Sequence, residues 1–240
     1  MWSVLNKEIN QFFGNLTGIL AIVLFLLING VFLFVLQDSS ILDFGYANLD
    51  KFFDLSPWVL MFLVPAITMR LFSDEFKVGT FEILRTKPLT DFNIILGKYF
   101  STLLIIFFVL IPTLVYVVTI KFLSTNGSID TGGLIGSYIG LFLLSAVFCS
   151  IGLCCSSMTS NAVVAFLISA FSCLLLYFGF SALSKLSFFA GTFDFYIEML
   201  GIDFHYRSMS RGVLDTRDLI YFFSIITLAL FITKKQLAKR

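Results

Sequence analysis

Six long apolar segments divide this chain of 240 residues and limit what it can fold into. A helix needs about 20 mostly apolar residues to cross a bilayer, within a range of about 17–25. Four segments reach that length easily, whereas the second is short and the sixth borrows charged residues at its start. The expected spans are residues 16–36, 56–72, 99–120, 134–155, 162–183 and 217–233. We therefore predict an all-α membrane protein, with one domain over residues 1–240 and six transmembrane helices.

The composition supports a membrane protein. Charged residues make up 13% of the chain, compared with about 25% in a typical soluble domain. The formal net charge of +1 provides no basic field for nucleic acid. We therefore expect membrane lipid, and no nucleic acid, among the partners.

The distribution of basic residues predicts the orientation. With a cytoplasmic N-terminus, 10 of the 16 Lys and Arg residues lie inside and 10 of the 15 acidic residues lie outside. Lys and Arg are enriched in cytoplasmic loops. We therefore expect both termini to be cytoplasmic.

The first 14 residues form an amphipathic pattern, with apolar residues at helical spacing opposite Lys7 and Glu8. This pattern predicts an interfacial helix that lies in the membrane plane before the first span. The alternative is an extension of the first span. The apolar run that follows is longer than the core of a signal peptide and has no small-residue cleavage site, so we expect it to be an uncleaved span.

The segment from residue 71 to 98 interrupts the apolar pattern with eight charged side chains. They are Asp74, Glu75, Lys77, Glu82, Arg85, Lys87, Asp91 and Lys98. Over residues 72–85, Phe72, Phe76, Phe81 and Leu84 can share one side of a helix, with the charges on the other side. We predict an amphipathic helix that protrudes between the second and third spans. The alternative is an ordinary juxtamembrane segment attracted to anionic lipid, which its nearly balanced charge disfavours.

Three residues predict the breaks in this protrusion. Gly79 can bend the helix, and Pro88 prevents helix through its position. Thr90 is a favourable N-cap for a helix that runs into the third span. Pro65 and Pro112 are expected to kink the second and third spans.

No catalytic or metal-binding motif is present in the sequence. There is no P-loop and no H-E-x-x-H, and Ser181 lies four residues from Lys185 rather than three. The only histidine, His205, falls in the expected outer loop and is interpreted as a solvated side chain. The cysteines lie in apolar runs without C-x-x-C spacing, as expected for small packing residues; they are Cys149, Cys154, Cys155 and Cys173. No span carries a charge near its centre. We therefore expect no enzyme activity and no metal or cofactor in this chain.

Gly132, Gly136 and Gly140 form a stripe of small residues at the start of the fourth span. Such stripes allow membrane helices to approach closely. The stripe predicts helix packing, either within the chain or against a second subunit.

The order of short motifs over residues 71–98 resembles the ABC-2 family of ABC-transporter permeases. In that family, acidic residues after the second span precede Gly-Thr, Glu, Leu and Pro, and then a Gly-Lys pair enters the third span. The matching residues are Asp74-Glu75, Gly79-Thr80, Glu82, Leu84, Pro88-Leu89 and Gly97-Lys98. The family also has an N-terminal interfacial helix, resembled by residues 5–13, and short, partly re-entrant outer helices before the sixth span, resembled by residues 186–216. GVLDTRDLIYF at 212–222 resembles the family's entry into that span.

The resemblance implies a permease subunit without a catalytic site, in a bacterial inner membrane. It implies an ATPase-coupling role for Asp74, Glu75, Gly79, Thr80, Glu82, Arg85 and Pro88, and an interfacial-helix role for Lys7 and Glu8. The implied partners are two copies of an ABC ATPase, which binds ATP and Mg²⁺, and a second permease subunit with a larger periplasmic domain. The short chain, its Phe-rich spans and its opening MWSVLNKEINQFF are similar to permease subunits associated with gliding motility and the secretion coupled to it.

Two alternatives remain open at this stage. The first is an ABC-2 exporter of a small molecule, lipid or peptide unrelated to motility. The second is a mechanotransmitter of the ABC family, which would use ATPase strokes to move an outer partner and would transport no substrate.

Overall fold

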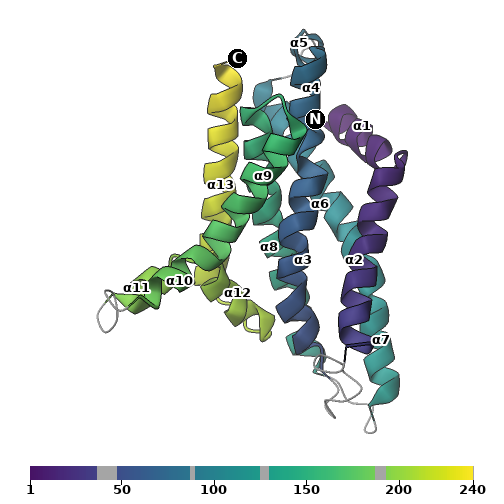
Figure 1. Ribbon diagram of the computed structural model, residues 1–240, viewed down its shortest axis with the longest axis vertical. Coiled ribbons are helices and arrows are strands. Elements are labelled where there is room, and N and C mark those ends of the chain that lie inside the picture. Colours follow the sequence, from purple (N-terminus) through teal and green to yellow (C-terminus); the bar gives the residue numbers. More distant parts are fainter. Residues whose placement is uncertain (37–47, 87–89, 125–129, 187–192, 240) are drawn as a thin grey trace.

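A computed structural model describes residues 1–36, 48–86, 90–124, 130–186 and 193–239, which form an all-helical bundle (Figure 1). No β-strand occurs within these ranges. The helices in chain order are α1 (Trp2–Phe13), α2 (Leu16–Phe34), α3 (Asp50–Thr68), α4 (Arg70–Val78), α5 (Thr80–Arg85), α6 (Asp91–Leu110), the 3₁₀ helix η1 (Ile111–Thr113), α7 (Leu114–Leu123), α8 (Thr131–Met158), α9 (Ala162–Leu174), the π-helix η2 (Leu175–Gly179), α10 (Phe180–Ser184), α11 (Asp194–Glu198), α12 (Ile202–Ser210) and α13 (Thr216–Ala238).

Five helical segments are long and apolar enough to cross a membrane. They are Asp50–Val78, Asp91–Leu123, Thr131–Met158, Ala162–Ser184 and Thr216–Ala238. The bent pair α1 and α2, with an angle of 67° between them, makes a sixth if the pair is one span. The predicted all-α, multi-pass membrane fold is therefore confirmed, and the count of six remains a prediction.

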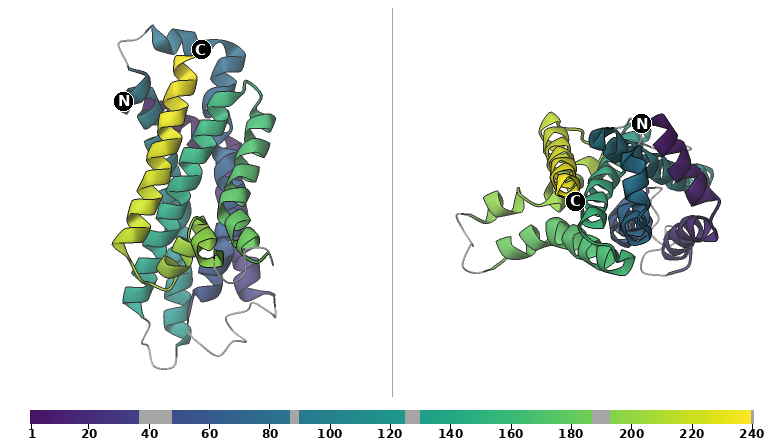
Figure 2. Two further views of the ribbon diagram at one scale, coloured as in Figure 1. Left: turned by 90° about the vertical axis from the view of Figure 1, so that its left-hand side faces the viewer. Right: turned by 90° about the horizontal axis from the view of Figure 1, so that it is seen from above.

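The central element of the bundle is α8, which packs against α3, α6, α9, α12 and α13. Seen along the bundle, these helices surround it (Figure 2). Its middle turns bury Leu144, Val147 and Phe148 completely. A helix that is apolar on all sides is expected at such a position, because every face must meet another helix or lipid.

Both termini lie at one end of the bundle, together with α1, α4 and α5 (Figure 1). We call this the terminal end. The opposite end carries α12 and the start of α3, and α10 and α11 project sideways from the bundle at that level (Figures 1 and 2).

The second span is longer than the sequence predicted. Helix begins at Asp50 rather than residue 56 and continues through α4 to Val78, giving 29 residues. At 1.5 Å per residue the rod is about 43 Å long, compared with about 30 Å for the bilayer core. The rod must therefore extend beyond the hydrocarbon, and it carries charges at both ends: Asp50, Lys51 and Asp54 at the start of α3, and Arg70, Asp74, Glu75 and Lys77 in α4.

The prolines act differently from one another. Pro112 lies in the three-residue 3₁₀ helix between α6 and α7, where a kink was predicted. Pro65 lies inside α3, and the helix continues through it as far as Thr68. The third span starts at Asp91, earlier than expected, because Thr90 caps it: the Thr90 hydroxyl accepts a hydrogen bond from Asn93 N at 3.3 Å.

Candidate functional site: a buried ion cluster at the terminal end

The protrusion at the terminal end is a bent pair of short helices, α4 and α5. Gly79 separates them with φ +77°, a left-handed conformation that glycine adopts without steric cost. Phe81 folds back onto Phe72 and Phe76, with ring centroids 6.1 and 5.0 Å away. This aromatic contact confirms the predicted shared apolar side, and it fixes α5 relative to α4.

Arg85 ties α5 to two spans. Its guanidinium lies 3.1 Å from Asp91 Oδ2 at the start of α6. It also donates to the carbonyl of Leu237 near the end of α13 at 3.4 Å. The tip of the protrusion therefore contacts the ends of two membrane helices directly.

Below the tip, Lys98 is buried among charged groups although it lies in an apolar stretch of α6. Its side chain is 1% exposed, and its ammonium lies 2.8 Å from Glu8 Oε1 of α1 and 2.9 Å from Glu75 Oε1 of α4. It donates to the carbonyl of Leu71 at 2.6 Å and lies 5.0 Å from the centroid of the Phe72 ring. A buried ammonium is tolerated only with such partners.

Lys7 of α1 completes the cluster from its solvent side. Its ammonium lies 2.8 Å from Glu75 Oε1 and 3.5 Å from Glu8 Oε1. Burial lowers the pKa of Lys7, but the hydrogen bond and charge of Glu75, together with Glu8, outweigh it, and the pKa lies above its ordinary value. We call Lys7, Glu8, Glu75 and Lys98 the ion cluster; its two cations and two carboxylates balance in charge.

Gly97 explains why α1 can reach Lys98. A Cβ placed at Gly97 would lie 3.0 Å from Val4 Cβ and 3.1 Å from the Met1 carbonyl of α1. The missing side chain lets α1 lie directly against α6, which brings Glu8 beside the next residue, Lys98. The Gly-Lys pair thus acts as one unit: glycine provides the space and lysine binds across it.

The structure brings some predicted site residues together and leaves others apart. Lys7, Glu8 and Glu75 meet in the ion cluster. The prediction that Glu75 lies on the charged outer side of the helix is wrong, because Glu75 is 9% exposed and faces inward. Thr80 and Glu82 are exposed on α5, and Asp74 is partly exposed on a different side of α4. Pro88 lies outside the described residues.

Lys98 is the member of the cluster whose role the sequence interpretation missed. A lysine between Ile95 and Phe100 in a membrane helix requires a partner, since an unpaired charge there is costly. That signal was present in the sequence, but the identity of the partners was not.

A hydroxyl from α8 occupies the junction between α3 and α4. Ser156 Oγ donates to the carbonyl of Met69 at 2.9 Å, and it accepts from Phe72 N at 3.1 Å and from Ser73 N at 3.3 Å. In an unbroken helix, Ser73 N would bond to the Met69 carbonyl. A side chain inserted into this ladder is a recognised cause of a bend.

A second buried polar group lies at the opposite end and corrects the interpretation of His205. The side chain is 3% exposed, with Nδ1 2.7 Å from Asp218 Oδ1 and Nε2 2.9 Å from the Met199 carbonyl. Its ring stacks on Tyr221, whose hydroxyl donates to the Leu200 carbonyl at 2.6 Å.

Both ring nitrogens of His205 have a partner: Nδ1 contacts the Asp218 carboxylate of α13, and Nε2 contacts the Met199 carbonyl before α12. His205 and Asp218 therefore pin the turn between α11 and α12 to α13.

The glycine stripe on α8 faces the segment between α12 and α13. A Cβ at Gly136 would lie 2.7 Å from the Gly212 carbonyl oxygen, and one at Gly140 would lie 2.6 Å from Met209 Cβ. Gly132 has only the Asp130 side chain nearby, at 3.5 Å. Two members of the stripe thus make close contacts within the chain.

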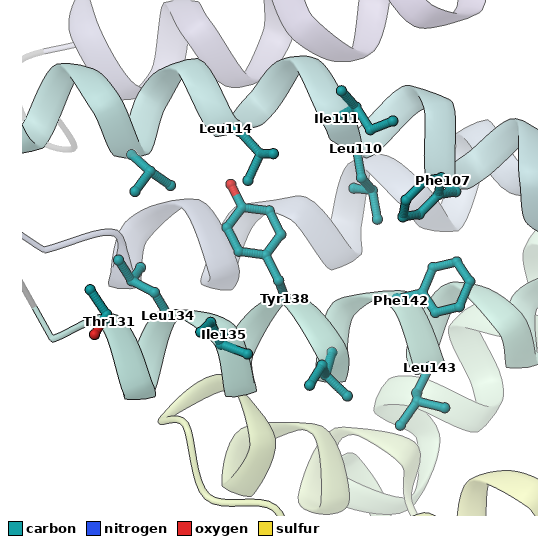
Figure 3. A pocket seen from close by; sticks show the side chains of 12 residues that line it. Phe107, Leu110, Ile111, Leu114, Thr131, Leu134, Ile135, Tyr138, Phe142 and Leu143 are labelled. Carbon is teal, nitrogen blue, oxygen red and sulfur yellow. The ribbon is translucent and has the colours of Figure 1, made fainter.

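An apolar groove of about 540 Å³ runs along the side of the bundle between α6, η1 and α7 on one wall and α8 on the other (Figure 3). Phe107 and Leu114 face Leu134 and Phe142 across it. The Tyr138 hydroxyl points towards the α6–α7 wall and lies 3.1 Å from Thr113 Oγ1. Among the described residues that line this groove there is no Asp, Glu, His, Lys or Arg. Such a surface suits a lipid chain or an apolar helix better than a hydrophilic substrate.

Comparison with known proteins finds no matching family model and no matching curated protein.

Proposed function

We propose that this chain is the membrane-spanning subunit of an ABC-2 type ABC transporter, driven by a separate ATPase. The observation that carries the proposal is the ion cluster, which joins the protruding helix α4 to the interfacial helix α1 and the span α6. Because these charges are buried, separating them is costly, and a displacement of α4 is transmitted to α1 and α6. A permease that receives work from outside its own chain needs such a connection.

The proposed point of contact with the ATPase is α5. Glu82 is exposed on it and has no ion pair within the described residues, so it is free to face a partner, whereas Arg85 is engaged with Asp91. Charges at a docking surface set orientation and specificity. Two ATPase copies that bind ATP and Mg²⁺ would close and push on two such protrusions.

The proposed assembly contains a second permease subunit, a different chain with a larger periplasmic domain. The proposed setting is a bacterial inner membrane, with the terminal end in the cytoplasm. This orientation is supported by the excess of Lys and Arg on that side. The proposed process is gliding motility and its associated protein secretion, supported by the resemblance of the opening residues and the Phe-rich spans.

One observation keeps the mechanotransmitter as a second candidate. The lateral groove between α6–α7 and α8 is lined almost entirely by apolar side chains. A chain that only transmits motion needs no hydrophilic path. A hydrophilic cleft between this chain and its partner subunit would remove this candidate.

The first experiment is purification of the tagged chain from its native cell in a mild detergent, with mass spectrometry of the proteins that accompany it. An ATPase together with a second, larger permease subunit would support the full proposal. An ATPase alone would favour a homodimeric exporter. The absence of any ATPase, under conditions that keep other ABC complexes intact, would refute the proposed function.

The second experiment reverses one charge on α5. Glu82→Lys is expected to lower ATP turnover of the reconstituted complex at least about tenfold, since a lost charge-assisted contact costs about 1.5–3 kcal/mol. Asp194→Lys, an equal charge change on an exposed residue of α11, is the matched control. Normal coupled turnover in Glu82→Lys would remove the role assigned to α5.

A further inference from the structure

A cavity of about 240 Å³ lies beside the turn between α1 and α2, at the terminal end of the bundle. We call it the elbow pocket; the bend between the two helices is visible in Figure 1. Its walls come from α1, α2, α3, α4 and α6, and the ion cluster touches it only through Glu8. The proposed function assigns no role to it.

The lining of the elbow pocket changes along the bundle, from mainly polar residues near the terminal end to mainly apolar residues further from it. Along the α3–α4 rod, Ala66 and Asp74 both line it, and they lie eight residues, or about 12 Å, apart. Asp74 is nearer the terminal end. Asn15, in the turn before α2, is likewise nearer the terminal end than Ala21 of α2. Polar groups above an apolar floor match the boundary between lipid head groups and acyl chains.

Two opposite charges in the lining of the pocket are available to a ligand. Arg70 and Asp74 lie one helical turn apart, and neither forms an ion pair or a side-chain hydrogen bond within the described residues. Glu8 also lines the pocket, but its carboxylate is paired with Lys98 and Lys7 in the ion cluster. The groups available to a ligand are therefore one cation and one anion, which favours a ligand that carries both a phosphate and an ammonium group.

We propose that the elbow pocket binds the head group of a zwitterionic phospholipid that has a primary amine. The phosphate lies on Arg70, and the ammonium donates hydrogen bonds to Asp74. A quaternary ammonium has no N–H donor and cannot make those bonds. The cavity equals about eight waters at about 30 Å³ each, enough for a phosphoethanolamine group but not for acyl chains. The chains leave sideways over Ala66, which is exposed.

The test uses the delipidated full-length protein in detergent and an equimolar mixture of three phospholipids with identical acyl chains. Their head groups are ethanolamine, choline and glycerol, and native mass spectrometry measures the bound lipid. Retention of the ethanolamine lipid is expected to exceed that of the other two at least about tenfold, because charged hydrogen bonds distinguish them. Equal retention of the three lipids would overturn the proposal.

Variants locate the site. Arg70→Gln and Asp74→Asn are each expected to lower the preference about tenfold, whereas Arg217→Gln and Asp194→Asn at the opposite end leave it unchanged. Ala66→Leu fills the apolar part of the elbow pocket and leaves every charge in place, so it is expected to lower retention of the ethanolamine lipid. It therefore tests the site even if a charge variant fails to fold. A preference that survives Arg70→Gln, Asp74→Asn and Ala66→Leu would place the lipid elsewhere and refute the assignment.

The head group can come from a phospholipid or from free phosphoethanolamine. Competition by soluble phosphoethanolamine distinguishes these two sources. The soluble compound lacks acyl chains, so it is expected not to displace the bound lipid when both are present at equal concentration. Equal competition by the soluble compound would overturn the lipid source, because the apolar floor would then contribute nothing to binding.

Discussion

Replacement of Lys98 by methionine tests the ion cluster directly. Methionine keeps an unbranched apolar stem against Phe72 but removes the charge and all three donors. Glu8 Oε1 and Glu75 Oε1 then lose a partner at 2.8 and 2.9 Å and remain buried. Only Lys7 is left to balance them, and its side chain is half exposed.

The expected cost is large because the side chains of the remaining carboxylates, Glu8 and Glu75, are only 8% and 11% exposed. Removal of one partner from a buried ion pair destabilises a protein by about 3–5 kcal/mol. For a chain of this size the melting temperature falls about 2–4 °C per kcal/mol. Lys98→Met should therefore lower it by about 6–20 °C. The matched control is Arg85→Met, which breaks the more exposed pair with Asp91 and should cost less than about 1 kcal/mol.

The assay is thermal unfolding of purified variants in one detergent, with a reversible denaturant titration to obtain free energies. A triple variant, Lys98→Met with Glu8→Gln and Glu75→Gln, removes the uncompensated charges and should recover most of the loss. Two results would refute the reasoning: a Lys98→Met variant no less stable than Arg85→Met, or a triple variant no more stable than Lys98→Met alone.

Two further predictions concern the opposite end of the bundle. Gly136→Leu should destabilise the protein by about 1–3 kcal/mol in the same assay, because its Cβ would lie 2.7 Å from the Gly212 carbonyl oxygen. Gly132→Leu, where only the Asp130 side chain is near, should be close to neutral, and equal stability of the two variants would contradict close packing at the stripe. His205→Phe should cost about 3–5 kcal/mol because it leaves Asp218 buried without a partner. Addition of Asp218→Leu should restore most of that stability; if it does not, packing rather than charge explains the loss.

Local signals in the sequence predicted much of the fold. The apolar segments located the spans, Gly79 located the break between α4 and α5, and the Thr90 cap located the start of α6. Each of these features depends on residues within a few positions of one another. Helix ends were less well predicted, because α3 and α6 continue as helices beyond the apolar residues that revealed them.

Contacts between distant segments could not be predicted in this way. Lys98 and Glu8 lie 90 residues apart, and neither residue indicates the other. His205 left a better signal, since it falls on the same helical face as Ile202, Tyr206 and Met209, all of which are buried. That spacing indicates a buried histidine. The interpretation of His205 as a solvated side chain rested on its location in an expected loop and gave this spacing too little weight.

The ion cluster and the junction at Ser156 together determine how a push on α5 would travel. Separating Lys98 from its carboxylates is costly, so α1, α4 and α6 move most readily as one body. At the junction with α3, the Ser156 hydroxyl donates to the Met69 carbonyl and accepts from Phe72 N and Ser73 N, and a side-chain link of this kind can rearrange at much lower cost. The rod should therefore bend between α3 and α4, against α8, rather than within the cluster. Under the proposed function, this places the pivot at the contact of α8 with the α3–α4 junction, and the cluster serves as the rigid connection that brings motion to it.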